Sequence, residues 1–442
     1  MKRRISVFVA VFLIVLGFVY GQKKPYSLGQ RPGQNVSDDP RRIPMPEPDL
    51  SKAPVQVLRG ATLIDGTGAN PVSNAVVVIR GNRIQEVGRL GQVTIPEGAA
   101  LIPAEGKYIL PGMIDLHTHI TYPTNVLEFF TDTDITATLR AVDKIKYYSN
   151  HGITSLRDVG SRDDVPFRLK EAVRSGLVTG PRIFPAGKLI TGTGGHGAEG
   201  GYLIVNGIVR EANGADDFRK AVREQIKAGA DCIKLASHYT LEEAAAAIDE
   251  AHQMGLRVTA DSHTFYITWA VQAGIDGIDH PLPRDEETIR LMAEKGTCAV
   301  PTIVAYYHIF QERGGYWGTQ SRRFYFDQAE NMELLRRMKK AGIKTGIGTD
   351  VIMDYATQLP KYYLMELRFF LEAGYTPMET IIAATRTGAE ILGMADKLGT
   401  IEKGKLADLI VVEENPLEKI DAVVQPSLVM VDGKIVNKHG ED

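Results

Sequence analysis

The sequence predicts an α/β protein, namely a (β/α)8 TIM barrel with a small β-sandwich domain formed from both ends of the mature chain. Strand-like and helical patterns alternate through the middle of the chain, and short β-branched runs stand on both sides of that middle. Alternation of this kind is typical of parallel sheets and barrels. A doubly wound open sheet is the alternative, but no G-x-G-x-x-G follows an early strand.

The barrel prediction rests on strand candidates and on the helical patterns between most of them. The strand candidates are residues 113–119, 154–160, 182–188, 232–237, 257–263, 277–280, 297–303 and 345–350. The helical patterns are residues 137–152, 165–176, 216–230, 241–255, 266–274, 285–296 and 326–342. Glycine stands at the end of each helical pattern, as is common just after a helix.

The flanking segments are rich in β-branched residues and in turn-forming Gly, Asn and Pro. Residues 55–66, 74–90 and 99–112 read as an antiparallel β unit, and residues 405–416 and 422–440 look alike. We therefore expect one small domain from both ends of the chain, whose termini commonly lie close together. The predicted parts are a signal peptide (1–21), a flexible leader (22–53), the small β domain (54–110 and 398–442) and the barrel (111–397).

The N-terminus predicts export, to the periplasm or to the medium. "MKRR" is a basic region, "ISVFVAVFLIVLGFVYGQ" is apolar, and Val19 and Gly21 fit the positions before a cleavage site. The mature chain would then start near Gln22. An uncleaved membrane anchor is the alternative, since the apolar run is only slightly short for a span. If the signal is cleaved, we expect no stable membrane partner.

Composition excludes several classes of function. Lys+Arg 51 against Asp+Glu 54 gives a net charge of -3, which argues against nucleic acid as a partner. Two cysteines far apart, Cys232 and Cys298, exclude a disulfide scaffold. We expect a small molecule or a peptide as the partner, and a homo-oligomer is left open.

Metal-binding residue types gather at the predicted strand ends. In a TIM barrel, the active site lies at the carboxyl ends of the strands. Those ends carry His117 and His119 on the first strand, His263 on the fifth, His280 on the sixth and Asp350 on the eighth, and the fourth strand carries Lys234. Imidazole and carboxylate ligands suit Zn, Mn, Fe or Ni.

Each of these residues also has a structural interpretation. An isolated H-x-H is weak evidence, and an aspartate such as Asp350 is a common helix N-cap. Lys234 inside a barrel needs an ion pair with a carboxylate, or loss of its charge. A neutral lysine amine can take up CO₂ as a carbamate, whose two oxygens can bridge two metals. The joint placement of the four histidines and Asp350 on strand ends favours a metal site.

Several motifs resemble the metal-dependent amidohydrolase superfamily, in the branch of imidazolonepropionase-like hydrolases and Xaa-Pro dipeptidases (prolidases). They are "LPGMIDLHTH" at the first strand, "TGTGGHG" after the third, "GIGTD" at the eighth and "AATRTGAEILGMADKLGTIEKGKLADLIVVEENPL" near the C-terminus. The resemblance covers residues 55–435 or so.

The resemblance implies two zinc ions per chain. His117 and His119 would bind the more buried ion, carboxylated Lys234 would bridge, and Asp350 would serve the first ion and the proton transfer. His263 and His280 would bind the second ion. One departure is that "VTADSHT" offers both Asp261 and His263 where that branch often has H-x-H; we favour His263 and keep Asp261 as the alternative.

The predicted function is metal-dependent hydrolysis of an amide or peptide bond in a dipeptide or an N-acyl amino acid. Asp350 would move the proton, and His196 in the "TGTGGHG" loop would contact the substrate or the oxyanion unless it is only bonded to backbone. Arg157 and Asp158 are expected to form a structural pair beneath the site. The alternatives are a deaminase or cyclic-amide hydrolase on the same barrel, and a non-catalytic binding protein.

Overall fold

The computed structural model describes residues 49–125, 127–199, 202–262, 264–308, 327–351 and 358–438. The predicted signal peptide and nearly all of the predicted leader lie outside these residues, as does His263. None of the helices in the described ranges combines the length and the apolar character needed to cross a membrane.

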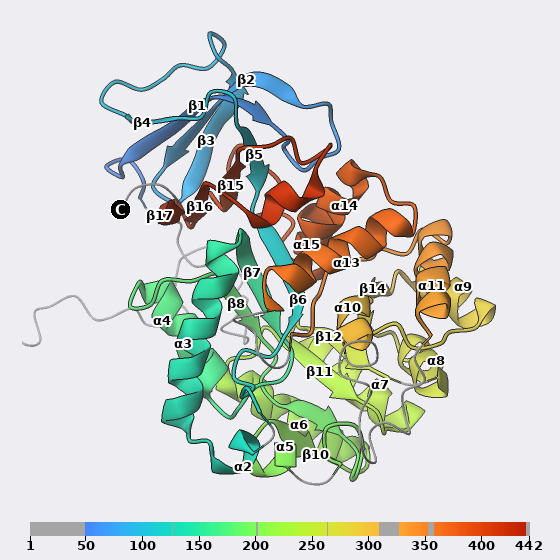
Figure 1. Cartoon of the computed structure of the whole chain (residues 1–442). Coiled ribbons are helices and arrows are strands. Elements are labelled where there is room, and N and C mark those ends of the chain that lie inside the picture. The colour runs from blue at the N-terminus through green and yellow to red at the C-terminus, as the bar shows by residue number, and fades with distance from the viewer. Residues whose placement is uncertain are drawn as a thin grey trace, which may run out of the picture. The chain divides into compact units, whose positions relative to one another are not determined.

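One mixed sheet joins strands from both ends of the chain (Figure 1). It contains β1 (Val55–Leu63), β2 (Val72–Arg80), β3 (Arg83–Arg89), β4 (Ala100–Pro103), β5 (Tyr108–Pro111), β15 (Leu409–Val412), β16 (Leu428–Val431) and β17 (Lys434–Lys438). The order is β17-β16-β15-β5-β1-β2-β3, with β4 also paired to β1. Apolar side chains of β1 and β2 share one core with those of β15 and β16, so both chain ends build the same unit.

The antiparallel prediction for the N-terminal strands is only partly right. β1, β2 and β3 pair antiparallel, but β4 and β5 pair parallel to β1. The connection between β3 and β4 is longer than a hairpin turn and so permits a crossover. β4 and β5 then run along successive parts of β1, because Gln56 faces Ala100 and Thr62 faces Tyr108.

The middle of the chain forms two parallel sheets. The first contains β6 (Met113–Thr118), β7 (Ile153–Asp158) and β8 (Arg182–Pro185). The second contains β9 (Leu189–Thr191), β10 (Val209–Glu211), β11 (Cys232–Ala236), β12 (Arg257–Asp261), β13 (Gly277–Asp279) and β14 (Cys298–Val300), in the order β10-β9-β11-β12-β13-β14. Seven of these strands match predicted ones, and β9 and β10 were not predicted.

The predicted eighth strand, residues 345–350, is not a regular strand in the structure. It makes an isolated bridge from Thr345 to Ala299, and its Ile347 carbonyl accepts a hydrogen bond of 2.9 Å from the Leu116 amide. Gly346 and Gly348 explain the irregularity, because glycine has low strand propensity. They also permit a close approach: a Cβ on Gly348 would lie 2.5 Å from the Val300 side chain.

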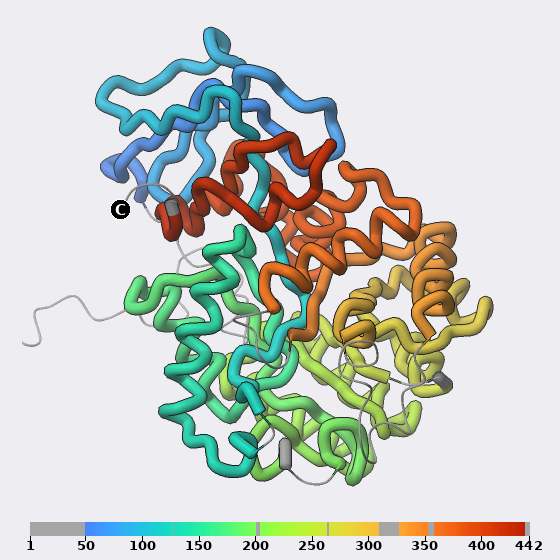
Figure 2. Tube along the Cα trace, in the orientation of Figure 1, coloured from blue at the N-terminus to red at the C-terminus, as the bar shows by residue number. Residues whose placement is uncertain are grey.

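The helices follow the strands in chain order. They are α2 (Glu128–Thr131), α3 (Asp134–Asn150), α4 (Val165–Ser175), α5 (Tyr202–Val205), α6 (Ala215–Ala228), α7 (Leu241–Gln253), α8 (Thr264–Gln272), α9 (Glu286–Lys295), α10 (Ile303–Tyr307), α11 (Gln328–Lys340), α13 (Lys361–Glu372), α14 (Pro377–Ala384) and α15 (Arg386–Ile391). Several pairs of consecutive helices contact each other, among them α3 with α4 and α6 with α7 (Figure 2). All seven predicted helical segments are present.

Candidate metal centre

His117 and His119 lie at the carboxyl end of β6, and both are buried. Their rings are 5.2 Å apart between centroids, in an edge-to-face arrangement. His119 Nδ1 lies 2.8 Å from the Gly160 carbonyl oxygen, which can only accept, so Nδ1 carries the proton. Towards a bound metal, Nε2 would then be the electron-pair donor, and a hydrogen bond to the other ring nitrogen is how proteins commonly orient a histidine ligand.

Asp350 reaches the same place from the irregular eighth segment. Its Oδ1 lies 3.2 Å from His119 Nε2 and 3.7 Å from His117 Nε2. Ligand atoms bound to one tetrahedral zinc ion at about 2.0–2.1 Å stand roughly 3.3 Å apart, so these spacings suit a shared ion. The ligand atoms of this trio all lie within 4.8 Å of one another. The predicted ligands of the first metal are therefore brought together.

The protonation states in this trio fit metal binding. Burial, and then the charge of Lys234, lower the pKa of His117 to about 3, so its imidazole is neutral. Burial raises the pKa of Asp350, but the charge that His117 carries at low pH and the neighbouring ring of His119 outweigh burial and hold that pKa below its usual range. Neutral imidazole and ionised carboxylate are the forms that bind a metal.

A second group of side chains adjoins the first at the ends of β12 and β13. His280 Nε2 lies 3.4 Å from Asp261 Oδ2, and the rings of His280 and His117 are 4.7 Å apart between centroids. His280 Nδ1 lies 2.7 Å from the Thr302 hydroxyl. Asp261, the alternative to His263, therefore faces His280 directly.

Two buried carboxylate oxygens in these groups have no hydrogen-bond partner within the described ranges. They are Asp261 Oδ1 and Asp350 Oδ1. A buried polar atom without a partner is costly, and a bound cation would satisfy both oxygens. The donor set and these two oxygens therefore fit a metal.

His196 follows β9 and contacts Asp261. Its Nε2 lies 2.9 Å from Asp261 Oδ2, and its Nδ1 lies 3.5 Å from Glu199 Oε1. Burial opposes protonation, but the carboxylates of Asp261 and Glu199 outweigh burial and raise the pKa of His196 to about 10. The ring is therefore an imidazolium held between two carboxylates.

Lys234 lies on β11 and is buried, and its Nζ is 2.5 Å from Asp279 Oδ2. The structure therefore contains the ion pair with a carboxylate that the sequence left open for this lysine. Asp279 also accepts from Arg157, at 2.8 Å, and from the Thr259 hydroxyl, at 2.9 Å, and it lies 3.3 Å from His117 Nδ1. The charges of Arg157 and Lys234 outweigh burial and hold the pKa of Asp279 well below its usual range.

Asp279 is the residue of this site that the sequence interpretation missed. Neighbours along a strand point to opposite faces, so strand alternation alone would bring only one of Asp279 and His280 to the site. His280 has a left-handed φ of 68°, which takes it out of the strand conformation. Both side chains can therefore contact His117. The "IDHP" sequence, with an aspartate directly before a candidate ligand, was the available signal.

The expected pair of Arg157 with Asp158 is wrong. Arg157 instead binds Asp279 and donates to the Leu116 carbonyl at 2.6 Å. Asp158 accepts from the Ile120 amide at 2.8 Å and from the Ser161 hydroxyl at 2.9 Å. Because the two residues are adjacent on β7, their side chains point to opposite faces and do not pair with each other.

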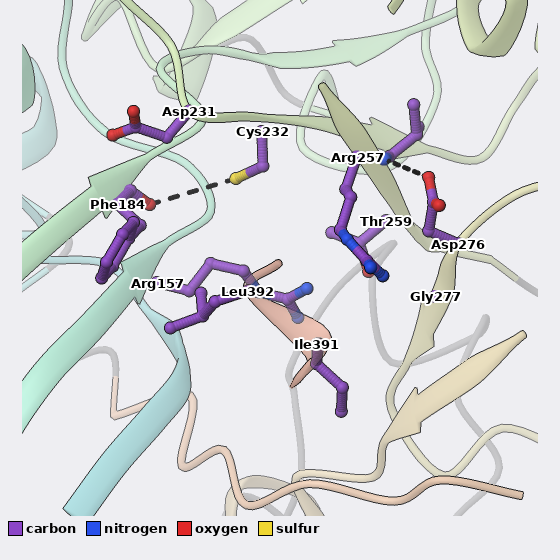
Figure 3. A pocket seen from close by; sticks show the side chains of 11 residues that line it. Arg157, Phe184, Asp231, Cys232, Arg257, Thr259, Asp276, Gly277, Ile391 and Leu392 are labelled. Atoms are coloured by element: carbon purple, nitrogen blue, oxygen red, sulfur yellow. Dashed lines mark hydrogen bonds between the residues drawn. The ribbon is translucent and has the colours of Figure 1, made fainter. Parts of the chain in front are cut away.

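A separate hollow lies at the amino ends of the strands. Its lining includes Arg157, Cys232, Arg257, Thr259 and Asp276 (Figure 3). Cys232 and Arg257 begin β11 and β12, whereas the candidate ligands lie at the carboxyl ends. None of the predicted site residues lines it, so we place the candidate site at the opposite ends of these strands.

Both cysteines of the chain are free.

Comparison with known proteins places this geometry in a family. Residues 108–436 match the amidohydrolase family. Ochratoxinase of Aspergillus niger is 28% identical over 443 residues, covering 89% of this chain and 88% of that protein. Imidazolonepropionase of Mesorhizobium japonicum is 26% identical, covering 82% and 92%.

Solved structures agree with the sequence comparison. The crystal structure of a prolidase complexed with N-methylphosphonate-L-proline is 30% identical, has a TM-score of 0.78, and covers 87% of this chain and 100% of that one. Such neighbours give the chain a TIM-barrel-like α/β fold with an additional domain, and they confirm the resemblance to this superfamily. The chain belongs to the amidohydrolase family and is a hydrolase that acts on carbon–nitrogen bonds.

Proposed function

We propose that the protein hydrolyses an amide or peptide bond of a small substrate, a dipeptide or an N-acyl amino acid, in a metal-dependent reaction. The observation that carries the proposal is the group formed by His117, His119 and Asp350, with matched spacings and protonation states. The similarity to a prolidase and to ochratoxinase supports a substrate of this class.

Zinc is the metal that we propose, with two ions per chain. His117, His119 and Asp350 would hold one ion, and His280 would hold the other. For the second ion we favour Asp261, because its Oδ2 lies 3.4 Å from His280 Nε2. Bound there, the metal would acidify water and polarise the scissile carbonyl.

The side chains of the chain would move the proton and orient the ligands. Asp350 is ionised and next to two imidazoles, so it can accept a proton from the attacking water and deliver it to the leaving nitrogen. His196 is charged and donates to Asp261, which makes it suited to orienting that carboxylate. A direct contact of His196 with the substrate remains part of the proposal.

Carboxylation of Lys234 has a structural condition. The carbamate forms on a neutral amine, whereas the Lys234 side chain is engaged in an ion pair with the Asp279 carboxylate, at 2.5 Å. The ion pair must therefore open before CO₂ adds. Arg157 already neutralises Asp279 from the other side, and this supports a bridging carbamate as the metal-loaded form.

We further propose a complete (β/α)8 barrel and a small β-sandwich, in an exported protein. Hydrogen bonds on both sides of the eighth segment support the barrel: Leu116 donates to Ile347, and Ala299 donates to Lys344, both at 2.9 Å. The basic and apolar N-terminal regions support export.

An activity screen tests the proposed function. Purified protein should be assayed on a panel of dipeptides, including Xaa-Pro dipeptides, and on N-acyl amino acids, before and after metal removal. We expect hydrolysis of some members, loss of activity with a chelator and recovery with zinc. Ammonia release from amino compounds without hydrolysis of any panel member would instead indicate a deaminase.

A further inference from the structure

A buried lysine outside the candidate ligand set lies directly behind it. Lys144 belongs to α3, and its side chain is fully buried. An ammonium group is expensive to bury, and a hydrocarbon side chain would fill the same space without that cost. Its position therefore calls for a reason other than packing.

Lys144 joins two segments that are distant in sequence. Its Nζ donates to the His119 carbonyl at 2.8 Å and to the Val351 carbonyl at 3.0 Å. His119 is a candidate ligand, and Val351 directly follows the candidate ligand Asp350. One side chain from a helix thus fixes the backbone at the ends of both ligand-bearing segments.

Asp115 ties the same two segments together on the other side of the ligands. Its Oδ1 accepts from the His117 amide at 3.1 Å and from the Thr349 amide at 3.0 Å, and its Oδ2 accepts from the Thr349 hydroxyl at 2.6 Å. Each ligand-bearing segment is therefore held by one or more hydrogen bonds to Asp115 on one side and by a hydrogen bond to Lys144 on the other.

We propose that Lys144 is a positioning residue, which clamps the backbone of His119 and Asp350 at the spacing that a metal ion requires. This inference rests on the proposed metal site and extends it to a residue of α3. Loss of the ammonium would free the Val351 carbonyl, and with it the backbone next to Asp350. The ligand atoms would then have to be ordered by the metal itself, which weakens binding.

The test compares Lys144→Met with Lys146→Met. Lys146 is exposed on the same helix, so it controls for the loss of a lysine from α3. The apparent dissociation constant of Zn²⁺ is measured by competition with a chromophoric chelator, and apo-protein unfolding by circular dichroism. We expect Lys144→Met to bind zinc about 10–100-fold more weakly, as removal of an outer partner of a ligand does. Its apo-protein should unfold within about 5 °C of wild type, and Lys146→Met should match wild type in both measurements.

A conservative variant separates the clamp from a general structural role. Lys144→Arg keeps a cation with several donors, so it should bind zinc at least threefold more tightly than Lys144→Met. Equal zinc affinity in wild type and Lys144→Met would overturn the clamp alone. The clamp would also be overturned if Lys144→Arg bound zinc no more tightly than Lys144→Met. It would be overturned likewise if the metal-free forms of both variants failed to fold. Failure of wild type to bind zinc would overturn the proposed function as well.

Discussion

Asp350 is expected both to bind a metal and to accept a proton. A substitution that removes only the ability to accept a proton separates these two roles. Asp350→Asn keeps the shape and one oxygen that can coordinate, but its amide cannot accept a proton. We predict that kcat falls by about 10²–10⁴-fold, the usual size of a lost general base, while metal content changes little. Metal analysis and steady-state kinetics at saturating zinc measure both quantities.

His117→Asn provides the matched contrast, because His117 is expected only to bind metal. Metal should be lost first in this variant, and activity in consequence. If Asp350→Asn kept a near-normal kcat, the aspartate would be only a ligand, and another group would have to carry the proton.

The ligand on β12 can be assigned by comparing Asp261→Ala with His263→Ala. Asp261 lies 3.4 Å from His280 and has a buried oxygen without a hydrogen-bond partner among the described residues. We predict that Asp261→Ala lowers bound zinc by about one ion per chain, whereas His263→Ala keeps the full content. The reverse order in the metal analysis would restore His263, the choice made from sequence.

At the level of single residues, the sequence predicted that His117, His119 and Asp350 would lie close together, because strand ends locate them without knowledge of contacts, and their ligand atoms do lie within 4.8 Å of one another. It could not locate Asp279, since the strand alternation that places other residues fails where His280 turns into a left-handed conformation. The partner of Lys234 depends on three-dimensional neighbours and was likewise not predictable from spacing.

Among the secondary-structure elements, the long amphipathic helices were predictable, whereas two of the short strands were not. α3 and α11 carry clear apolar periodicity and end before Gly152 and Gly342, which adopt the left-handed φ expected after a helix. β9 and β10 have three residues each, too few to show an alternating pattern, and they were missed although the equally short β13 and β14 were predicted. The eighth segment failed as a strand because its glycines favour irregular backbone.

Arg182 on β8 connects the barrel-like part to the small β domain, and its removal should destabilise the protein. Its Nε lies 2.7 Å from Asp408, and its Nη2 lies 2.5 Å from Asp432. Breaking such a partly buried pair leaves the Asp408 carboxylate without its cation, so we predict that Arg182→Met lowers the free energy of unfolding by about 3 kcal/mol at pH 7. Arg174→Met is the control, because its pair with Glu171 is exposed and should contribute at most about 1 kcal/mol.

The effect of Arg182→Met should depend on pH. Burial raises the pKa of Asp432, but Arg182 outweighs burial and holds it below its usual range. A carboxylate with a lowered folded-state pKa stabilises the protein above its unfolded pKa of about 3.9, and this stabilisation is lost as pH falls. Urea unfolding should therefore show a smaller difference between wild type and variant at pH 3.5 than at pH 7. A constant difference would contradict the role of this ion pair.

For the whole molecule, the proposed export makes a prediction about the mature N-terminus. When the full chain is expressed in a host that exports it, mass spectrometry of the exported fraction should give a start near Gln22. An intact Met1 in the membrane fraction would instead support an uncleaved anchor.

Amide hydrolysis is proposed to require a metal held by His117, His119 and Asp350. The most direct measurement is a titration of chelator-treated protein with zinc, in which bound metal and the hydrolysis rate on the best panel substrate are followed together. We expect no hydrolysis without metal, and a rate of hydrolysis that rises with bound zinc to a plateau near two ions per chain. A full rate of hydrolysis at zero bound metal would contradict it.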